Sequence, residues 1–378
     1  MLALFWLSLA MLLYTFLGYP LILWLTAKLL PARSAPGITA SSAELPRVSI
    51  VLSVYNEEQV IAAKIDNFLS LDYPADRLEL VVVSDRSTDR TEEIIRTAAC
   101  SRVRLYVQPE RRGKTFNLNH GVEMANGDLV VFTDANSMFS PDALRRLVAP
   151  LSDPSIGLVS GRSIYVDAQR QGEIAGGTYR AYEEWLKALE SRVSSIVGAD
   201  GAIYALRKEL YEPLPPEVIN DFVHTIEVVQ KGFRAVSEQF AICTEEVDEG
   251  HRDEFARQVR MMAQSWCIYF SYIGGLLRHG HLVYAWALTS HKLLRWMVLP
   301  NLLLLLGGNL ALFGDNALYS SFVVGQTVFW VAVAVGRFFE GGIVKMPYLL
   351  VSIHAAAVVG LLRWLTGASY ATWMPRKN

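Results

Sequence analysis

Most charged residues of this 378-residue chain lie in its middle, and this distribution constrains the fold more than any other feature. Residues 1–27 contain no Asp, Glu, Lys or Arg, and further uncharged runs lie at 297–314, 317–336 and 346–362. An apolar helix of about 20 residues is long enough to cross a bilayer core of about 30 Å. The pattern therefore predicts a membrane protein with an N-terminal anchor, a central water-facing domain and a C-terminal transmembrane bundle.

Basic residues flank the central domain on both sides. Lys28 and Arg33 follow the first apolar run, and His291, Lys292 and Arg295 precede the next one. Because positively charged flanks stay on the cytoplasmic side, we expect the domain to face the cytoplasm. The first run has no basic residue before its apolar core and exceeds the roughly 7–15 residues of a signal-peptide core, so we expect an uncleaved anchor.

These observations divide the chain into five predicted parts. They are an anchor at 1–30, a linker at 31–46, a cytoplasmic domain at 47–265, interfacial helices at 266–290 and a transmembrane bundle at 291–378. The net charge of −2 gives no support for nucleic-acid binding. The cysteines, Cys100, Cys243 and Cys267, are odd in number and lack metal-binding spacing, so we expect reduced thiols.

Short apolar runs alternate with helical patterns in the first half of the central domain. The predicted strands cover 48–54, 78–83, 103–107 and 129–132. Strands that alternate with helices of 10–15 residues predict βαβ units and a mostly parallel sheet. The first strand is not followed by GxGxxG, and the chain contains no GxxxxGK[ST], so a Rossmann dinucleotide site and a P-loop are both disfavoured.

Two polar side chains follow the strand at 129–132. Asp134 and Asn136 would point to the same side of an extended segment, at the strand end where α/β sheets bind ligands. Oxygen ligands of this kind suit a hard divalent cation that also binds waters and phosphates. On spacing alone, a turn leading into a helix at Ser140 explains the pair equally well.

Four ordered motifs resemble those of family 2 glycosyltransferases. They are SVYNEE at 53–58, SDRSTD at 84–89, GK at 113–114 and TDAN at 133–136. The resemblance spans roughly residues 46–270. It implies a GT-A fold and inverting transfer from a nucleotide-activated sugar. The flanking apolar spans are similar to those of membrane-bound polysaccharide synthases and lipid-linked-sugar transferases in that family.

The resemblance also implies roles for individual residues. Tyr55, Asn56, Glu57 and Asp85 would contact the uracil and ribose, and Lys114 would approach the base or the diphosphate. Asp134 and Asn136 would hold Mg²⁺ or Mn²⁺ at the place of the DxD motif. Asn in the second position weakens the metal site. Arg86 stands where the family usually has Gly, so that turn must differ or be strained.

The second half of the domain carries the expected base. Asp221 falls where the family has its general base, although a carboxylate in the first turn of a helix is also favoured by the helix dipole. Arg260 matches the Arg of the Gln-x-x-Arg-Trp motif of processive members and would bind the diphosphate, but Arg257 and Met261 replace its Gln and Trp. We expect Tyr182 and Trp185, on a helix at 179–193, to pack in the core.

The predicted function is metal-dependent, inverting hexosyl transfer from a UDP-sugar to a growing polysaccharide or lipid-linked glycan, at the cytoplasmic membrane face and with export partners. One alternative is a polyprenyl-phosphate sugar transferase, whose phosphate acceptor needs less from Asp221. The other is an inactive homologue that serves as a sensor or assembly subunit, for which Arg86, Asn136 and Met261 are the best support.

Overall fold

The computed structural model describes residues 1–30, 45–98, 100–167, 172–173, 177–246, 254–339 and 342–367. The predicted linker at 31–46 lies almost entirely outside the described residues, as does Arg33. The chain divides into two compact units. One comprises Met1–Thr26, Gly250–Gly274 and Ala285–Ala368, and the other comprises Ala27–Glu249, Gly275–Tyr284 and Ser369–Asn378.

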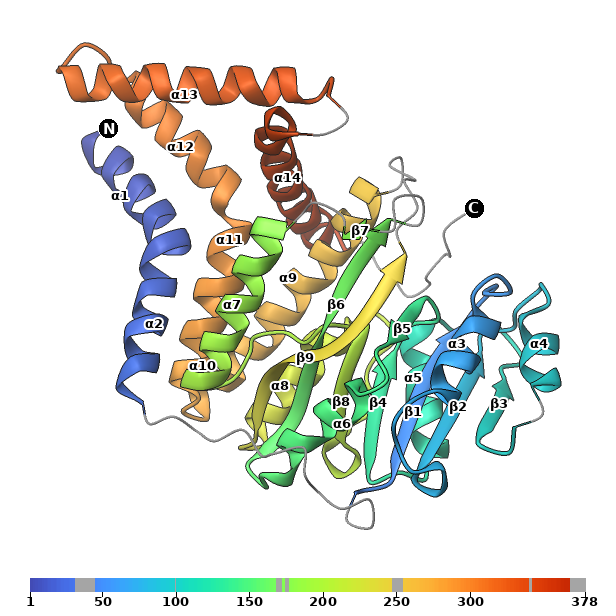
Figure 1. The fold of residues 1–378 in the computed structure, drawn as a ribbon. Helices are drawn as coiled ribbons and strands as arrows, with labels where there is room; N and C mark the ends of the chain where they lie inside the picture. Colours follow the sequence, from blue (N-terminus) through green and yellow to red (C-terminus); the bar gives the residue numbers. More distant parts are fainter. Residues whose placement is uncertain are drawn as a thin grey trace. The chain divides into compact units, whose positions relative to one another are not determined.

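The second unit is built on one mixed sheet, to which nine strands contribute in the described part of the chain. The strands are β1 (Val48–Val54), β2 (Leu78–Ser84), β3 (Val103–Val107), β4 (Leu129–Thr133), β5 (Ser137–Phe139), β6 (Ile156–Asp167), β7 (Gly172–Glu173), β8 (Ile203–Arg207) and β9 (Arg234–Glu246). Their order is β3-β2-β1-β4-β8-β6-β9-β5, and β7 pairs with β6 (Figure 1). The four strands predicted from sequence are therefore confirmed.

Parallel and antiparallel pairing divide the sheet into two halves. β1 pairs parallel with β2 and β4, and β2 pairs parallel with β3. β8 then runs antiparallel to β4 and to β6. The polar residues that follow β1, β2 and β4 consequently share one edge of the sheet, where ligands bind in open α/β folds.

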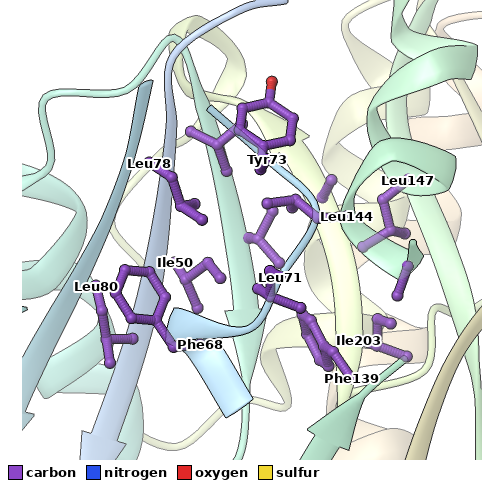
Figure 2. Close-up of a cluster of buried hydrophobic side chains, with 14 of the residues drawn as sticks. Ile50, Phe68, Leu71, Tyr73, Leu78, Leu80, Phe139, Leu144, Leu147 and Ile203 are labelled. Carbon is purple, nitrogen blue, oxygen red and sulfur yellow. The ribbon is translucent and has the colours of Figure 1, made fainter. Parts of the chain in front are cut away.

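Helices cover both faces of this sheet. They are α3 (Ile61–Leu69), α4 (Thr91–Thr97), α5 (Lys114–Met124), α6 (Ala143–Val148), α7 (Gly177–Val193) and α8 (Asn220–Gln230). Ile50 of β1 belongs to the core cluster that contains Phe68 of α3 and Leu144 of α6 (Figure 2). The next residue, Val51, belongs to a second cluster with Leu118 of α5. Successive strand residues point to opposite faces, so the continuous apolar runs fill two cores at once.

The sheet is strongly curved between β4 and β5. Along the strand order these two strands are four steps apart, which would be about 19 Å in a flat sheet. Only three residues separate them in the chain, and the four peptide units from Thr133 to Ser137 span at most about 14 Å. Register shifts along β6 and β9 provide the bend, and one lies at Gly161, where an added Cβ would come within 2.5 Å of the Ala241 carbonyl oxygen.

The first unit is helical. Its elements are α1 (Leu2–Leu13), α2 (Tyr19–Leu29), α9 (Glu254–Arg278), α10 (Leu282–Leu288), α11 (Leu294–Trp296), α12 (Val298–Leu310), α13 (Ala317–Gly336) and α14 (Met346–Leu365), with the ends of α2, α9 and α10 assigned to the other unit. Phe5 of α1 packs edge-on against Tyr319 of α13, with ring centroids 5.2 Å apart. Gly308 lets α12 approach α1 closely, because an added Cβ would lie 3.2 Å from the Phe5 backbone nitrogen.

Among the described residues, three helices are long and apolar enough to cross a membrane: Leu2–Leu29, Ala317–Gly336 and Ile343–Leu365. The helices Leu282–Trp296 and Val298–Leu310 qualify only as a pair, and a bend of 61° separates them. The uncharged run at 297–314 therefore does not form a spanning helix by itself. Candidate spans lie at both ends of the chain, as the charge distribution predicts.

Candidate functional site

The loops after β1 and β2 are tied together by their own polar side chains. Oδ1 of Asn56 accepts from the Thr88 backbone N–H at 2.8 Å, and the Glu58 N–H donates to Oδ2 of Asp89 at 3.1 Å. Asn56 has a φ of 55°, in the left-handed region that Asn tolerates better than most residues. Asn56 therefore holds the loop after β1 against the loop after β2.

Arg86 occupies the left-handed region with a φ of 60°. We predicted that the turn after β2 must either differ or be strained, and the strained alternative is confirmed. The same turn holds Ser87, whose Oγ accepts from the Asn56 N–H at 3.2 Å.

Asp85 holds the basic turn that follows β3. Its carboxylate is 4% exposed and accepts from the backbone N–H of Arg112 at 2.8 Å and of Gly113 at 3.1 Å. Gly113 has a φ of 89°, which a larger residue would resist. The Arg111 guanidinium lies 3.7 Å from the ring centroid of Tyr55, so the turn also contacts the end of β1. Asp85 thus fixes the backbone that delivers Lys114.

Lys114 and Asp134 face each other across the site. The Lys114 ammonium donates to Oδ1 of Asp134, and the two side chains are 39% and 38% exposed. Desolvation lowers the pKa of Lys114, but the charges of Asp134 and Asp221 outweigh it and leave the pKa above its ordinary value. Because this ion pair is partly exposed at the strand ends, the Lys114 ammonium can exchange the Asp134 carboxylate for a diphosphate.

The segment from Asp134 to Asn136 is a turn, so the expectation of an extended segment is wrong. The Ser137 N–H donates to the Asp134 carbonyl oxygen at 3.2 Å, and β5 begins immediately. The short turn is required because the chain must reach β9, the partner of β5, within three residues. Strand geometry therefore gives no reason to expect the side chains of Asp134 and Asn136 on the same side.

The donor set suits a cation that takes most of its ligands from elsewhere. In the part of the chain that the structure describes, no three His, Cys, Asp or Glu side chains are grouped to hold a metal. One half-exposed carboxylate and one amide in the same turn nevertheless match the way Mg²⁺ binds through few protein ligands plus waters and substrate phosphates. Asp134 and Asn136 would be those ligands.

Two further carboxylates belong to this region. Burial raises the pKa of Glu57 to about 7, and the charges of Asp134 and Asp89 act in the same direction. Burial also raises the pKa of Glu245 above its ordinary value, although a hydrogen bond from Ser137 opposes this. Glu245 was not predicted from sequence, because its position depends on β9 pairing with β5.

Lys64 of α3 lies beneath the turn and was also missed. It is 2% exposed, and its ammonium donates to Thr133 Oγ1 at 2.9 Å and to the Ser137 carbonyl oxygen. Burial lowers the pKa of Lys64 to about 8, against the nearby acidic groups. A sequence signal existed: Lys64 shares the buried face of α3 with Ile61, Ile65 and Phe68, where an apolar residue is the norm.

Asp221 comes to the same edge through α8. The neighbouring Asn220 accepts from Thr115 Oγ1 at 2.9 Å, which joins the start of α8 to the start of α5 beside Lys114. The Asp221 carboxyl carbon would lie 3.5 Å from a Cβ added at Gly201. Asp221 is therefore a first-turn carboxylate whose charge also acts on Lys114, so both interpretations of its position are compatible with the structure.

An aromatic cluster packs α8 against the sheet. The His224 ring lies 5.3 Å from that of Phe132, and its Nδ1 is 3.1 Å from the Tyr204 hydroxyl. Burial lowers the pKa of His224 to about 3, so the ring is neutral. His224 is one turn after Asp221, and its contacts with Phe132 and Tyr204 hold this part of α8 against β4 and β8.

The expectation that Tyr182 and Trp185 of α7 pack in the core is wrong. Trp185 is 43% exposed and Tyr182 is only partly buried, whereas Leu186 and Glu190 are buried, among the α7 residues whose burial the structure describes. The Glu190 carboxylate accepts from the Val197 N–H at 3.4 Å. The helix thus turns a partly polar face inward, which hydrophobicity alone does not reveal.

Arg260 lies in α9, in the helical unit. Met261, beside it, is 37% exposed, whereas Trp266 is 2% exposed and its Nε1 donates to the Ala357 carbonyl oxygen at 2.9 Å. Trp266 is consequently a packing residue of that unit. Arg260 remains a predicted diphosphate ligand.

Comparison with known proteins agrees with this architecture. Residues 49–202 match the family model described as Glycosyl transferase family 2. The chain is 33% identical over 144 residues to a probable glycosyltransferase, YdaM, of Bacillus subtilis (36% of this chain, 34% of that protein). It is 34% identical over 141 residues to the beta-monoglucosyldiacylglycerol synthase of Synechocystis (36% and 29%), and 32% identical over 120 residues to a poly-beta-1,6-N-acetyl-D-glucosamine synthase of Staphylococcus aureus (31% and 29%).

These matches cover only about a third of each relative. A solved structure, the mannosyltransferase PcManGT from Pyrobaculum calidifontis in complex with GDP-Man and Mn²⁺, superimposes with a TM-score of 0.70. The two chains are 24% identical, and the match covers 96% of this chain and 99% of that one. At this identity the likeness establishes the fold.

Proposed function

We propose that this chain, whose residues 49–202 match the family 2 glycosyltransferase model and whose fold is that of a GT-A transferase, is an inverting, metal-dependent hexosyltransferase. Its donor is a UDP-sugar, and its acceptor is a growing polysaccharide or a lipid-linked glycan. The observation that carries the proposal is the convergence of Lys114, Asp134 and Asp221 at the carboxyl edge of the parallel strands. The relatives named as glycolipid and polysaccharide synthases support this choice of acceptors.

The donor site is assigned to the loops after β1, β2 and β4. Tyr55, Asn56, Glu57 and Asp85 surround the nucleoside, and Lys114 exchanges its contact with Asp134 for the diphosphate. A divalent cation, Mg²⁺ or Mn²⁺, held by Asp134 and Asn136, would neutralise the departing diphosphate. Arg260 would add a positive charge to the same leaving group.

The reaction needs one proton transfer. Asp221 accepts the proton of the acceptor hydroxyl while its oxygen forms a bond to the anomeric carbon. The bond from that carbon to the nucleoside diphosphate breaks on the opposite face, which inverts the configuration. General-base assistance of this kind typically contributes 10²–10⁴-fold to a rate.

We further propose that the domain faces the cytoplasm from the membrane. Supporting this are the candidate spans at Leu2–Leu29, Ala317–Gly336 and Ile343–Leu365, together with the basic flanks at Lys28 and at Lys292. Protease protection of the full chain in right-side-out and inverted vesicles tests the orientation. Cleavage between residues 45 and 246 only in inverted vesicles is the expected result.

The decisive experiment offers UDP-sugars and GDP-sugars to the purified full-length protein in lipid nanodiscs with a membrane lipid extract. We expect turnover of a UDP-sugar, loss of turnover with EDTA, and loss with Asp134→Ala. Asp128→Ala is the matched control, because Asp128 lies at the opposite end of β4 and accepts from the Arg47 N–H at 3.1 Å. Product with retained anomeric configuration would overturn the mechanism.

The alternatives give different results in the same assay. Transfer to a polyprenyl phosphate, with little effect of Asp221→Asn, would identify a polyprenyl-phosphate sugar transferase. Nucleotide-sugar binding without turnover of any offered donor would identify the sensor or assembly subunit. Turnover of GDP-mannose alone would replace UDP as the donor nucleotide.

A further inference from the structure

The turn that carries Asp134 and Asn136 closes a ring of strands. β4, β8, β6, β9 and β5 are hydrogen-bonded in that order, and the turn joins the last strand covalently to the first. The ring brings Thr133, the last residue of β4, and Ser137, the first residue of β5, close together. Whatever holds these two residues also sets the conformation of the turn between them.

Lys64 holds both ends of the turn. Its ammonium donates to the Thr133 hydroxyl at 2.9 Å and to the Ser137 carbonyl oxygen, and it lies 4.5 Å from the ring centroid of Phe139. The Lys64 side chain is only 2% exposed, so water molecules cannot replace these hydrogen-bond acceptors. Burying a charged amine is costly unless its hydrogen bonds are made, so these two contacts strongly define where the ammonium lies.

Ser137 is braced from the other side as well. Its hydroxyl donates to Oε1 of Glu245, and the two residues face each other in the antiparallel pair of β5 and β9. Ser137 is therefore fixed by its backbone to α3 and by its side chain to β9. The β5 end of the turn is thus restrained by two contacts of Ser137, and the β4 end is restrained by the hydrogen bond from Lys64 to Thr133.

We propose that Lys64 is a positioning residue for the metal and diphosphate site. It acts through Thr133 and Ser137 to hold Asp134 and Asn136 in the conformation that receives the cation. This inference rests on the proposed function, because it assumes that the turn binds a metal–diphosphate. It predicts that loss of Lys64 weakens metal-dependent nucleotide binding and leaves metal-independent binding through Tyr55 and Asp85 intact.

The test is calorimetric titration of UDP into the full-length protein, once with Mn²⁺ and once with EDTA. For Lys64→Met, which keeps the length and removes the charge, we expect at least tenfold weaker binding with Mn²⁺ and less than a twofold change with EDTA. Thr133→Val, which keeps the shape of the acceptor side chain, should give a smaller change of the same kind. The double variant should be close to Lys64→Met alone, because Lys64→Met already removes the Lys64–Thr133 hydrogen bond and Thr133→Val adds only the loss of a long, 3.4 Å bond from the Thr133 hydroxyl to the Asp134 carbonyl oxygen.

Lys208→Met is the matched control. Its ammonium also donates to a backbone carbonyl oxygen, that of Ala125, but Lys208 adjoins the opposite end of β4. It should not alter either titration. Equal affinity of wild type and of both Thr133→Val and Lys64→Met with Mn²⁺ would overturn the inference, and so would equal losses with Mn²⁺ and EDTA. If Lys64→Met does not fold, Thr133→Val decides. Failure of the wild type to bind any nucleotide with Mn²⁺ would instead refute the proposed function.

Discussion

The ammonium of Lys114, at the start of α5, donates to Oδ1 of Asp134, at the end of β4. Both side chains are more than a third exposed, so the ion pair contributes little to stability, about 0–1 kcal/mol. We therefore expect Lys114→Met to lower donor affinity at least tenfold while the melting temperature stays nearly unchanged. Lys231→Met is the control, because it removes another ion pair, with Glu212 at 2.8 Å, and should leave affinity unchanged. A large loss of stability with normal affinity would contradict the assignment.

Asp221→Asn separates binding from chemistry. The amide cannot accept the acceptor proton, so we expect transfer to fall by about 10²–10⁴-fold. Donor affinity should be preserved, because Asn220 and Thr115 still hold the start of α8. Single-turnover rates and titration of the donor measure the two effects, with Glu217→Gln as a nearby control. Unchanged transfer would exclude Asp221 as the base.

Glu57 makes stability depend on pH. The pKa of Glu57 is raised from an ordinary 4.5 to about 7. The protonated side chain therefore adds no ionisation cost to the folded state below pH 4.5, and the folded state loses stability as the pH rises through 7 and the carboxyl group ionises. Glu57→Gln should therefore gain about 1–3 kcal/mol relative to wild type above pH 7, and nothing at pH 4.5. Thermal unfolding at pH 4.5 and pH 8.5 checks this, with Glu123→Gln on α5 as a control. A gain that is the same at both pH values would show that the effect is not ionisation.

Asp85→Asn should disrupt the basic turn. The wild-type carboxylate accepts from two backbone N–H groups, whereas an Asn side chain presents an NH₂ group to one of them. A buried donor without an acceptor costs about 1–3 kcal/mol. We expect a lower melting temperature together with weaker donor binding, since Lys114 follows this turn. Asp76→Asn, on an exposed turn, should change neither property.

Arg86→Gly should stabilise the protein. A left-handed conformation costs an ordinary L-residue about 1–2 kcal/mol, and Gly gives back about 0.5–1 kcal/mol of that gain through its greater freedom in the unfolded chain. We expect a net gain of roughly 0.5–1 kcal/mol in thermal unfolding. Arg96→Gly within α4 should instead destabilise by about 1 kcal/mol. A loss of stability in Arg86→Gly would mean that the Arg side chain makes compensating contacts.

Local pattern was sufficient to predict the parallel half of the sheet. β1 to β4 are continuous apolar runs with turn residues at their ends, and all four strands were predicted from those runs. The motif order also placed Asp85, Lys114 and Asp134 at one edge. These features depend on residues close together in the chain.

Long-range pairing set the features that the sequence did not reveal. The turn at Asp134 exists because β5 must pair with β9, about a hundred residues later. The same pairing brings Glu245 to Ser137, and no local period predicts it. The exposed face of α7 and the buried Lys64 are failures of a different kind, since both violate the rule that apolar residues face the core.

The hydrogen bond from Thr115 to Asn220 has an evolutionary consequence. It joins two chain segments separated by about a hundred positions, and the residues next to it, Lys114 and Asp221, are the proposed diphosphate ligand and base. Neither Thr115 nor Asn220 is assigned to a substrate, yet losing either one leaves the other buried without this hydrogen bond. Among relatives of this chain, the residues at positions 115 and 220 should therefore change together. This covariation should not depend on which donor or acceptor a relative uses.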